Sequence, residues 1–266
     1  MAMEFANRPG LVVYLTCGDP SVKATRDIAL AAIGAGADII ELGVPFSDPV
    51  ADGPVIQRAS ERAITKKTTL ADVLQIAREI RERSRAGLIV FSYMNPIMRY
   101  GVERFCRDAR EAGVDGALVT DLPIEEAGDY IRHMRAQSLA TVFLASPTSP
   151  DDRLHSIANA STGFVYAVSR TGVTGTQKEL TGDAEGLVAR LRKFTGLPIA
   201  VGFGISTAEQ FTSVGRFADA AVVGSAIVQT IERNPDEPAE AVASFVHRLV
   251  SSRRRWGATP AGASAL

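Results

Sequence analysis

The stretch Glu41-Leu-Gly-Val-Pro-Phe-Ser-Asp-Pro-Val-Ala-Asp-Gly-Pro54 follows the mostly apolar run from Ala37 to Ile40. Glu41 alternates with Ile40 and Leu42, as a strand residue would, so its side chain points to the opposite face from theirs. In a closed barrel, one of those two faces is the interior. Because a carboxylate is costly to place beside an apolar core, we predict that Glu41 is a catalytic residue at the mouth of a barrel.

The segment after that strand is predicted to be an ordered loop. Its prolines cannot donate to a β-ladder, and they bias the residues before them toward extended geometry. Residues 45–53 would therefore carry Asp48 and Asp52 over the end of the strand. A simpler alternative is that these aspartates only cap turns and the following helix, as Asp beside Gly and Pro often does.

Composition sets the class of protein. The chain has 266 residues, 46% of them hydrophobic, which suits one α/β barrel domain. A net charge of −1 gives no electrostatic reason to expect nucleic acid or an anionic membrane as a partner. Two cysteines cannot form a disulfide framework, and no apolar run reaches the roughly 20 residues that span a bilayer. We expect a cytoplasmic protein.

Short aliphatic runs alternate with segments of helical period, which is typical of βαβ units around a parallel sheet. The predicted strands are Leu11 to Thr16, Asp38 to Leu42, Leu88 to Ser92, Gly116 to Val119, Thr141 to Ala145, Phe164 to Val168, Pro198 to Gly202 and Ala220 to Val223. The predicted helices include Val22 to Ala35, Val55 to Ile64, Leu70 to Ser84, Val102 to Ala112, Ile124 to Gln137, Asp151 to Ala160 and Ala184 to Lys193, and the last helix runs to about Ser251.

This alternation predicts an α/β fold, a single-domain (β/α)8 TIM barrel with an extra helix after strand two and a short helix after strand eight. The barrel would occupy residues 1–253, and residues 254–266 would form a flexible C-terminal tail. A recurrent pattern, Ala-Gly-Ala-Asp38, Ala-Gly-Val-Asp115 and Phe-Ala-Asp219, is expected to mark a helix end followed by a buried strand.

In such barrels the active site lies at the C-terminal ends of the strands. The histidines His133, His155 and His247 fall on predicted helices, so neither a metal site nor a histidine base is expected. No lysine lies within a predicted strand, which argues against a Schiff-base mechanism. The remaining candidates are carboxylates and a phenol: Glu41, Asp52, Asp121 and Tyr166.

Two glycine turns predict a phosphate site. Gly202-Phe-Gly204-Ile-Ser206 follows strand seven, and Gly224-Ser225-Ala226 follows strand eight and opens a helix. Glycine lets a backbone approach a ligand closely, and a helix N-terminus favours an anion. Tight turning alone is the competing explanation, but turns of this kind after two consecutive strands favour a phosphate ester as substrate.

Residues 169–183 lack apolar periodicity and are predicted to be a long loop. Loops of this length in compact domains are commonly lids or binding loops. We expect this one to close over bound substrate and to bring Thr174 toward the loop that carries Asp52.

Several stretches together resemble the tryptophan synthase α subunit family. They are Leu15-Thr-Cys-Gly-Asp-Pro20, Glu41 to Pro54, Tyr93-Met-Asn-Pro96, Asp121-Leu-Pro123, Gly163-Phe-Val-Tyr166, Val173-Thr-Gly175, Gly202-Phe-Gly-Ile205 and Val223-Gly-Ser-Ala-Ile227. Members are (β/α)8 barrels that cleave indole-3-glycerol phosphate to indole and glyceraldehyde 3-phosphate. The resemblance implies catalytic carboxylates at Glu41 and Asp52. It also implies substrate contacts at Tyr166, Tyr93, Asp121 and Thr174, and phosphate contacts at Gly175, Gly204, Gly224 and Ser225.

The resemblance further implies an α2β2 complex in which β subunits carry pyridoxal phosphate and consume the indole, with no cofactor in this chain. The contact with the β subunit would involve residues 45–54 and the region around Asn95-Pro96. Family members usually have a helix before the first strand, and we expect that helix to be shortened or absent here.

Three alternative functions stay open. A stand-alone indole-3-glycerol phosphate lyase would share the same site residues. A phosphate-binding isomerase would need an acid or base at the end of strand one, where Leu15-Thr16 offers none. A non-catalytic barrel that activates a partner would be favoured by the loss of Glu41, which is present.

Overall fold

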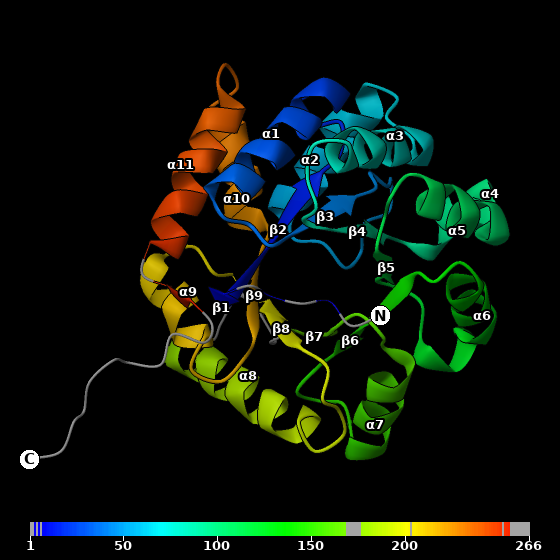
Figure 1. The fold of residues 1–266 in the computed structure, drawn as a ribbon, viewed down its shortest axis with the longest axis vertical. Helices are drawn as coiled ribbons and strands as arrows, with labels where there is room; N and C mark the ends of the chain where they lie inside the picture. The colour runs from blue at the N-terminus through cyan, green and yellow to red at the C-terminus, as the bar shows by residue number, and fades with distance from the viewer. Residues whose placement is uncertain are drawn as a thin grey trace, which may run out of the picture.

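The computed structural model describes residues 3, 5, 7–168, 177–202, 204–251 and 253–255. Its centre is a closed barrel of eight parallel strands, hydrogen-bonded to one another in chain order from β2 to β9. Figure 1 shows the helices arranged around these strands. The barrel strands are β2 Gly10–Thr16, β3 Ile39–Gly43, β4 Gly87–Ser92, β5 Gly116–Val119, β6 Ala140–Ala145, β7 Val165–Val168, β8 Ile199–Gly202 and β9 Ala220–Val223.

The helices cover the outside of the barrel. They are α1 Val22–Ala35, α2 Pro54–Thr65, α3 Leu70–Arg81, α4 Met94–Tyr100, α5 Val102–Glu111, α6 Gly128–Ala136, α7 Asp151–Ala160, α8 Gln177–Leu191, α9 Ala208–Val214, α10 Ser225–Arg233 and α11 Pro238–Val250, with a 3-10 turn at Ile124–Glu126. The predicted fold class is confirmed: both α2 and α3 follow β3, and the short α10 follows β9.

Three helical predictions were wrong in detail. Ile124 to Gln137 is a 3-10 turn followed by α6. Helix α4 was missed, because its seven residues are too few to show a helical period. Helix α8 begins at Gln177, so the predicted loop over residues 169–183 is wrong for its second half, and residues 169–176 lie outside the described part of the chain. Gly182 led to this error: glycine disfavours a helix interior by about 1 kcal/mol but does not forbid it.

Side-chain caps fix the beginnings of several helices. The Ser21 hydroxyl accepts a hydrogen bond from the Ala24 N–H at the start of α1. Thr69 and Asp72 form a reciprocal capping box at α3, and Thr207 and Gln210 form another at α9. Such caps satisfy first-turn N–H groups that have no partner within the helix, so these boundaries are set by local sequence.

The barrel interior holds a layer of apolar side chains from seven of the strands, two of them from β9, and from Phe164 just before β7. This layer contains Val12, Ile39, Ile89, Leu118, Val142, Phe164, Ala200, Ala220 and Val222. Phe5 packs edge-on against Phe164, and the Met3 N–H donates to the Gly163 carbonyl. The described residues before β2 therefore form no helix, and Met3 and Phe5 cover the N-terminal end of the barrel instead.

The recurrent aspartates have a structural role at that end of the barrel. Asp38 accepts from the Leu11 N–H, Asp115 from the Leu88 N–H, and Asp219 from the Ile199 N–H, each at 2.8 Å. Each carboxylate also pairs with an arginine: Arg253, Arg81 and Arg192, respectively. The repeated sequence pattern lies before a buried strand, as predicted, and its aspartate also joins that strand to the preceding one.

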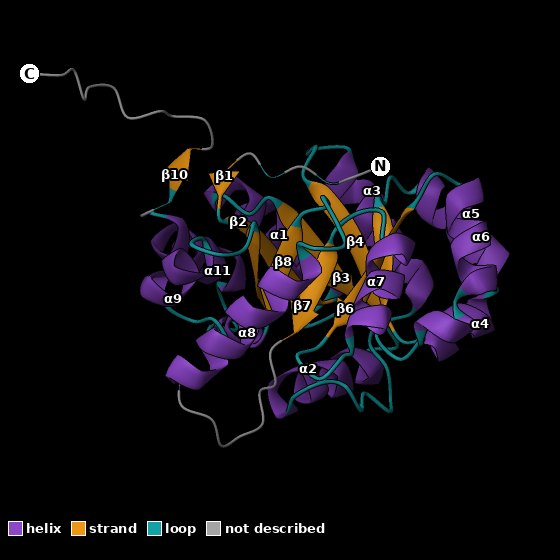
Figure 2. Cartoon of the chain, turned by 90° about the horizontal axis from the view of Figure 1, so that it is seen from below, coloured by secondary structure: helices purple, strands orange, loops and turns teal. Residues whose placement is uncertain are grey.

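A two-stranded sheet lies at the same end. Strand β1, Asn7–Arg8, pairs antiparallel with β10, Arg254–Arg255. Figure 2 shows both strands at the top of the view and α2 at the opposite end of the barrel. The predicted tail, residues 254–266, therefore begins with a paired strand, and its residues after Arg255 lie outside the described part.

Candidate active site

Glu41 lies on β3 with its carboxylate inside the barrel. It is aligned with Tyr14 of β2 and Ile89 of β4, and its side chain is fully buried. Neither carboxylate oxygen has a hydrogen-bond partner within the described residues. Burial away from water disfavours the charged form and raises the pKa of Glu41 to about 8. At neutral pH this group is therefore mostly protonated and can donate a proton.

Asp52 lies on the β3–α2 loop, two residues before α2 begins, and is half-buried. Burial raises the pKa of its carboxyl to about 6, and the hydrogen bond from Tyr93 opposes that rise. At neutral pH Asp52 is mostly ionised. Two carboxyl groups in different environments thus hold different protonation states, which is how an acid and a charge-stabilising base are separated in one site.

Hydrogen bonds order the loop that carries Asp52. The Asp52 N–H donates to the Pro49 carbonyl at 3.0 Å, and the Gln57 side-chain amide donates to the Asp52 carbonyl at 2.9 Å. Asp48, by contrast, is exposed and accepts a hydrogen bond from the Ser47 hydroxyl. Of the two loop aspartates, Asp52 is the more buried, and its carboxylate accepts a hydrogen bond from the Tyr93 hydroxyl.

Two tyrosines lie beside the carboxylates inside the barrel. Burial raises the pKa of Tyr166, and the charges of Glu41 and Asp52 raise it further. Tyr14 is buried too, and the same two charges contribute to its raised pKa. The structure therefore brings together the predicted residues Glu41, Asp52 and Tyr166, and it adds Tyr14.

Two glycines make room for these rings. A side chain at Gly43 would clash with the Tyr14 hydroxyl at 2.4 Å, and one at Gly202 would clash with the Tyr166 hydroxyl at 2.6 Å. The sequence analysis did not identify Tyr14 as a site residue. Tyr14 lies opposite Glu41 only in the register in which β2 pairs with β3, and that register must be known before Tyr14 can be found.

The predicted phosphate loops lie at the ends of β8 and β9. Gly204 has a φ of 58°, a conformation that other residues adopt only with strain. Gly224 precedes α10, and no side chain of the described residues caps that helix, so its first-turn N–H groups stay open to a ligand. In the β8 loop, the N–H groups of Ser206 and Thr207 are already bonded to the Gln210 side chain.

The other predicted substrate contacts have mixed outcomes. Tyr93 is buried and bonded to Asp52. Asp121 accepts a hydrogen bond from the Met94 N–H at 2.7 Å, so its carboxylate satisfies the first turn of α4. Thr174 and Gly175 lie outside the described residues.

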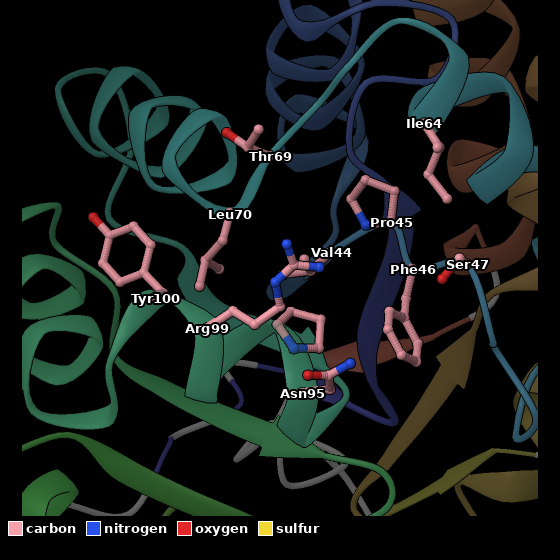
Figure 3. A pocket seen from close by; sticks show the side chains of 11 residues that line it. Val44, Pro45, Phe46, Ser47, Ile64, Thr69, Leu70, Asn95, Arg99 and Tyr100 are labelled. Carbon is pink, nitrogen blue, oxygen red and sulfur yellow. The ribbon is translucent and has the colours of Figure 1, made fainter.

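A cavity of about 440 Å³ lies beside the β3–α2 loop that carries Asp52, between that loop and helices α3 and α4. It is lined by Val44, Pro45, Phe46, Ser47, Ile64, Thr69, Leu70, Asn95, Pro96, Arg99 and Tyr100. Figure 3 shows Arg99 between Leu70 on one side and Phe46 on the other. Two apolar side chains near the cavity are largely exposed. Val50, on the β3–α2 loop, is 85% exposed, and Met98, on helix α4, is 63% exposed.

The described ranges hold neither a metal-binding cluster nor a membrane-spanning helix. Within them, no group of three or more His, Cys, Asp or Glu side chains could hold a metal ion. None of the helices there is long and apolar enough to cross a bilayer.

Comparison with known proteins identifies the family. The sequence pattern of the tryptophan synthase alpha chain family matches residues 1–253. The tryptophan synthase alpha chain of Solibacter usitatus (strain Ellin6076) is 50% identical over 254 residues, which are 95% of this chain and 94% of the relative. The tryptophan synthase A-subunit from Pyrococcus furiosus superimposes with a TM-score of 0.86 at 39% identity, covering 93% of this chain and 100% of that chain.

A chain of the tryptophan synthase complex from Pyrococcus furiosus is also similar. Its TM-score is 0.84 at 37% identity, and the match covers 93% of this chain and 100% of that chain. The chain therefore belongs to the tryptophan synthase alpha chain family, and it is a lyase of tryptophan synthesis.

Proposed function

We propose that this chain cleaves indole-3-glycerol phosphate to indole and glyceraldehyde 3-phosphate, as the α subunit of a tryptophan synthase. The observation that carries this proposal is the buried, unpartnered Glu41 carboxyl, with a pKa near 8, inside the same barrel mouth as the ionised Asp52. Retro-aldol cleavage of a bond to indole needs a proton donor and a fixed negative charge. These two carboxyl groups supply both.

The reaction can be followed through these groups. Glu41 gives its proton to indole C3, and the positive charge that forms on the ring is stabilised at the indole N–H by the Asp52 carboxylate. The ionised Glu41 then takes the proton of the glycerol hydroxyl next to the bond. The carbon–carbon bond breaks, its electrons return to the ring, and the hydroxyl carbon becomes the aldehyde. Glu41 ends protonated, ready for another turnover.

The phosphate of the substrate is proposed to bind at the N-terminus of α10. Open N–H groups and the positive end of the helix dipole favour a dianion there. Gly224, Ser225 and Gly204 would contribute backbone contacts, and Gly175 a further one. This grip would orient the indole end toward Glu41 and so reduce the entropic cost of reaching the transition state.

The partner is proposed to be a β subunit, in an α2β2 complex located in the cytoplasm. Its docking surface would be the cavity wall between the catalytic loop and Asn95-Pro96, extended by the exposed Val50 and Met98. Pyridoxal phosphate would belong to the β subunit, as the family membership implies. A partner seated on this loop would also touch the segment that carries Asp52.

Supplying indole-3-glycerol phosphate to the chain, alone and with a cognate β subunit, tests this function. We expect equimolar indole and glyceraldehyde 3-phosphate, formed faster in the presence of the β subunit. The absence of both products under both conditions would contradict the proposal. High activity alone, with no complex in sedimentation, would instead favour the stand-alone lyase.

A further inference from the structure

A network of charged side chains joins the two ends of the proposed site from the outside of the barrel. Arg62 of α2 forms a two-pronged contact with Asp19, at 2.8 and 2.7 Å, and donates to Glu232 of α10 at 2.9 Å. Arg58, one turn earlier on α2, forks onto Glu232 at 3.1 and 3.0 Å. Arg62 is thus the centre of the network, because it contacts both acids.

The network is anchored in the interior. The Asp19 side chain, in the turn between β2 and α1, is only 4% exposed, and Arg62 is 34% exposed. A fork–fork contact of this kind fixes direction as well as distance, because the planar guanidinium matches the carboxylate. Helix α2 is therefore held to the barrel at a defined angle and not merely attracted to it.

Helices α2 and α10 also share an apolar contact. Val55, Ile56 and Ala59 of α2 cluster with Val228 of α10 and with Tyr14 from the barrel. A side chain added at Gly224, just before α10, would lie 3.8 Å from Ile56. The two helices therefore pack against each other near the proposed phosphate-binding end of α10. Closer to the C-terminal end of α10, the ion pairs of Arg58 and Arg62 with Glu232 join them.

The two helices carry different parts of the proposed site. Helix α10 begins at the proposed phosphate position. Helix α2 begins two residues after Asp52, and its Gln57 is bonded to the Asp52 carbonyl. Any rotation or sliding of α2 against α10 would therefore change the distance between the bound phosphate and the catalytic carboxylate.

We propose that Arg62 is a positioning residue, which sets Asp52 at a fixed distance from the phosphate-binding end of α10 through Asp19 and Glu232. This inference rests on the proposed function, because it needs Asp52 to act on substrate. Arg62 touches no reacting atom. A misplacement of about 1 Å in a catalytic group can lower a rate on the order of 100-fold, so a small shift of α2 is enough to matter.

The test compares Arg62→Lys with Arg26→Lys. Lysine keeps the positive charge but cannot fork onto Asp19 while also reaching Glu232. Arg26 is the matched control: it contacts Asp27 twice and Glu79 once, joins α1 to α3, and is 21% exposed. We expect both variants to lower the melting temperature slightly.

Only Arg62→Lys should lower kcat for indole release, by about 10-fold, while the inhibition constant of inorganic phosphate stays within about 2-fold of the parent value. In an Asp52→Asn background, Arg62→Lys should change kcat by less than about 2-fold, because both act through one group. If Arg62→Lys proves unstable, Glu232→Gln replaces it, with an expected loss in kcat of about 3-fold.

Two results would overturn the proposal. In the first, Arg62→Lys has the same kcat as the parent although Asp52→Asn is strongly impaired. The same holds for Glu232→Gln if it replaces Arg62→Lys. The other is a double variant in which the two losses multiply. A parental kcat for Asp52→Asn itself would show that the proposed function is wrong, which separates that failure from a failure of the positioning role.

Discussion

The Tyr93 hydroxyl donates a hydrogen bond to the Asp52 carboxylate at 3.0 Å. The same oxygen accepts a hydrogen bond from the Ala51 N–H at 2.9 Å. One buried phenol on the loop after β4 therefore holds both the Asp52 side chain and the backbone beside it. The loop position and the protonation of Asp52 are coupled through this contact.

Tyr93→Phe should shift the pH dependence of the reaction. The hydroxyl stabilises ionised Asp52 and opposes the effect of burial, so its loss should raise the pKa of Asp52 above about 6. The reaction needs ionised Asp52. As the pH is lowered, the variant should therefore lose activity at a higher pH than the parent does. The acid limb of a plot of kcat against pH measures this shift.

Tyr100→Phe is the control for that variant, because its hydroxyl bonds to Asp108 on a helix instead. Its acid limb should match that of the parent. An unchanged acid limb for Tyr93→Phe would contradict the proposed coupling.

The buried Glu41 should make stability depend on pH. Its folded pKa of about 8 lies above 4.5, the ordinary value of a glutamate carboxyl in an unfolded chain. The folded state therefore binds the proton more tightly, and its stability falls as pH rises from about 4.5 to about 8. Denaturant unfolding at a series of pH values should show the parent losing stability relative to Glu41→Gln across that window. Parallel curves would show that Glu41 is ionised in the folded state.

Gly204→Val should raise KM steeply with little change in kcat. Among the described residues, no atom lies within 4 Å of a side chain placed at Gly204, so the effect comes from the φ of 58° and from blocking the approach of the phosphate. Gly196→Val is a suitable control, because that glycine also has open space around it but lies before β8. Inorganic phosphate should inhibit the parent competitively, and equal KM values for the two variants would argue against a phosphate site here.

Met98→Glu should weaken binding of a β subunit without changing the activity of the chain alone. The side chain is 63% exposed, so a charge costs little in the free protein, but it would be buried without a partner in the complex. We expect the dissociation constant, measured by titration calorimetry, to rise by about 10-fold or more. Ala136→Glu, on the exposed end of α6, should bind as the parent does. Equal affinity for both variants would place the interface elsewhere.

The sequence predicted where Glu41 and Asp52 lie because local patterns decide both positions. The alternation around Glu41 was enough to place it inside a barrel, and prolines were enough to place Asp52 on a loop over the strand end. Tyr14 could not be found that way, because its position beside Glu41 depends on the register of β2 with β3, a long-range property. The partners of Arg62 come from distant parts of the chain for the same reason.

The fold was predicted best where its signal is repeated. Eight alternations of strand and helix left little freedom in the topology, and the aspartate pattern at Asp38, Asp115 and Asp219 marked strand junctions correctly. The beginning of α8 was predicted too late because Gly182 is typical of a loop. The helix forms in spite of this glycine, since buried residues such as Leu187 pack it against the barrel.

The most direct test of the central claim is the rate of indole-3-glycerol phosphate cleavage by Glu41→Gln, measured with a cognate β subunit present. Glutamine keeps the size of the side chain but cannot donate the proton to indole C3, so we predict a loss in kcat of roughly 100-fold or more. Circular dichroism and the affinity for inorganic phosphate should match those of the parent. A folded Glu41→Gln variant that cleaves the substrate at the parental rate would contradict the account.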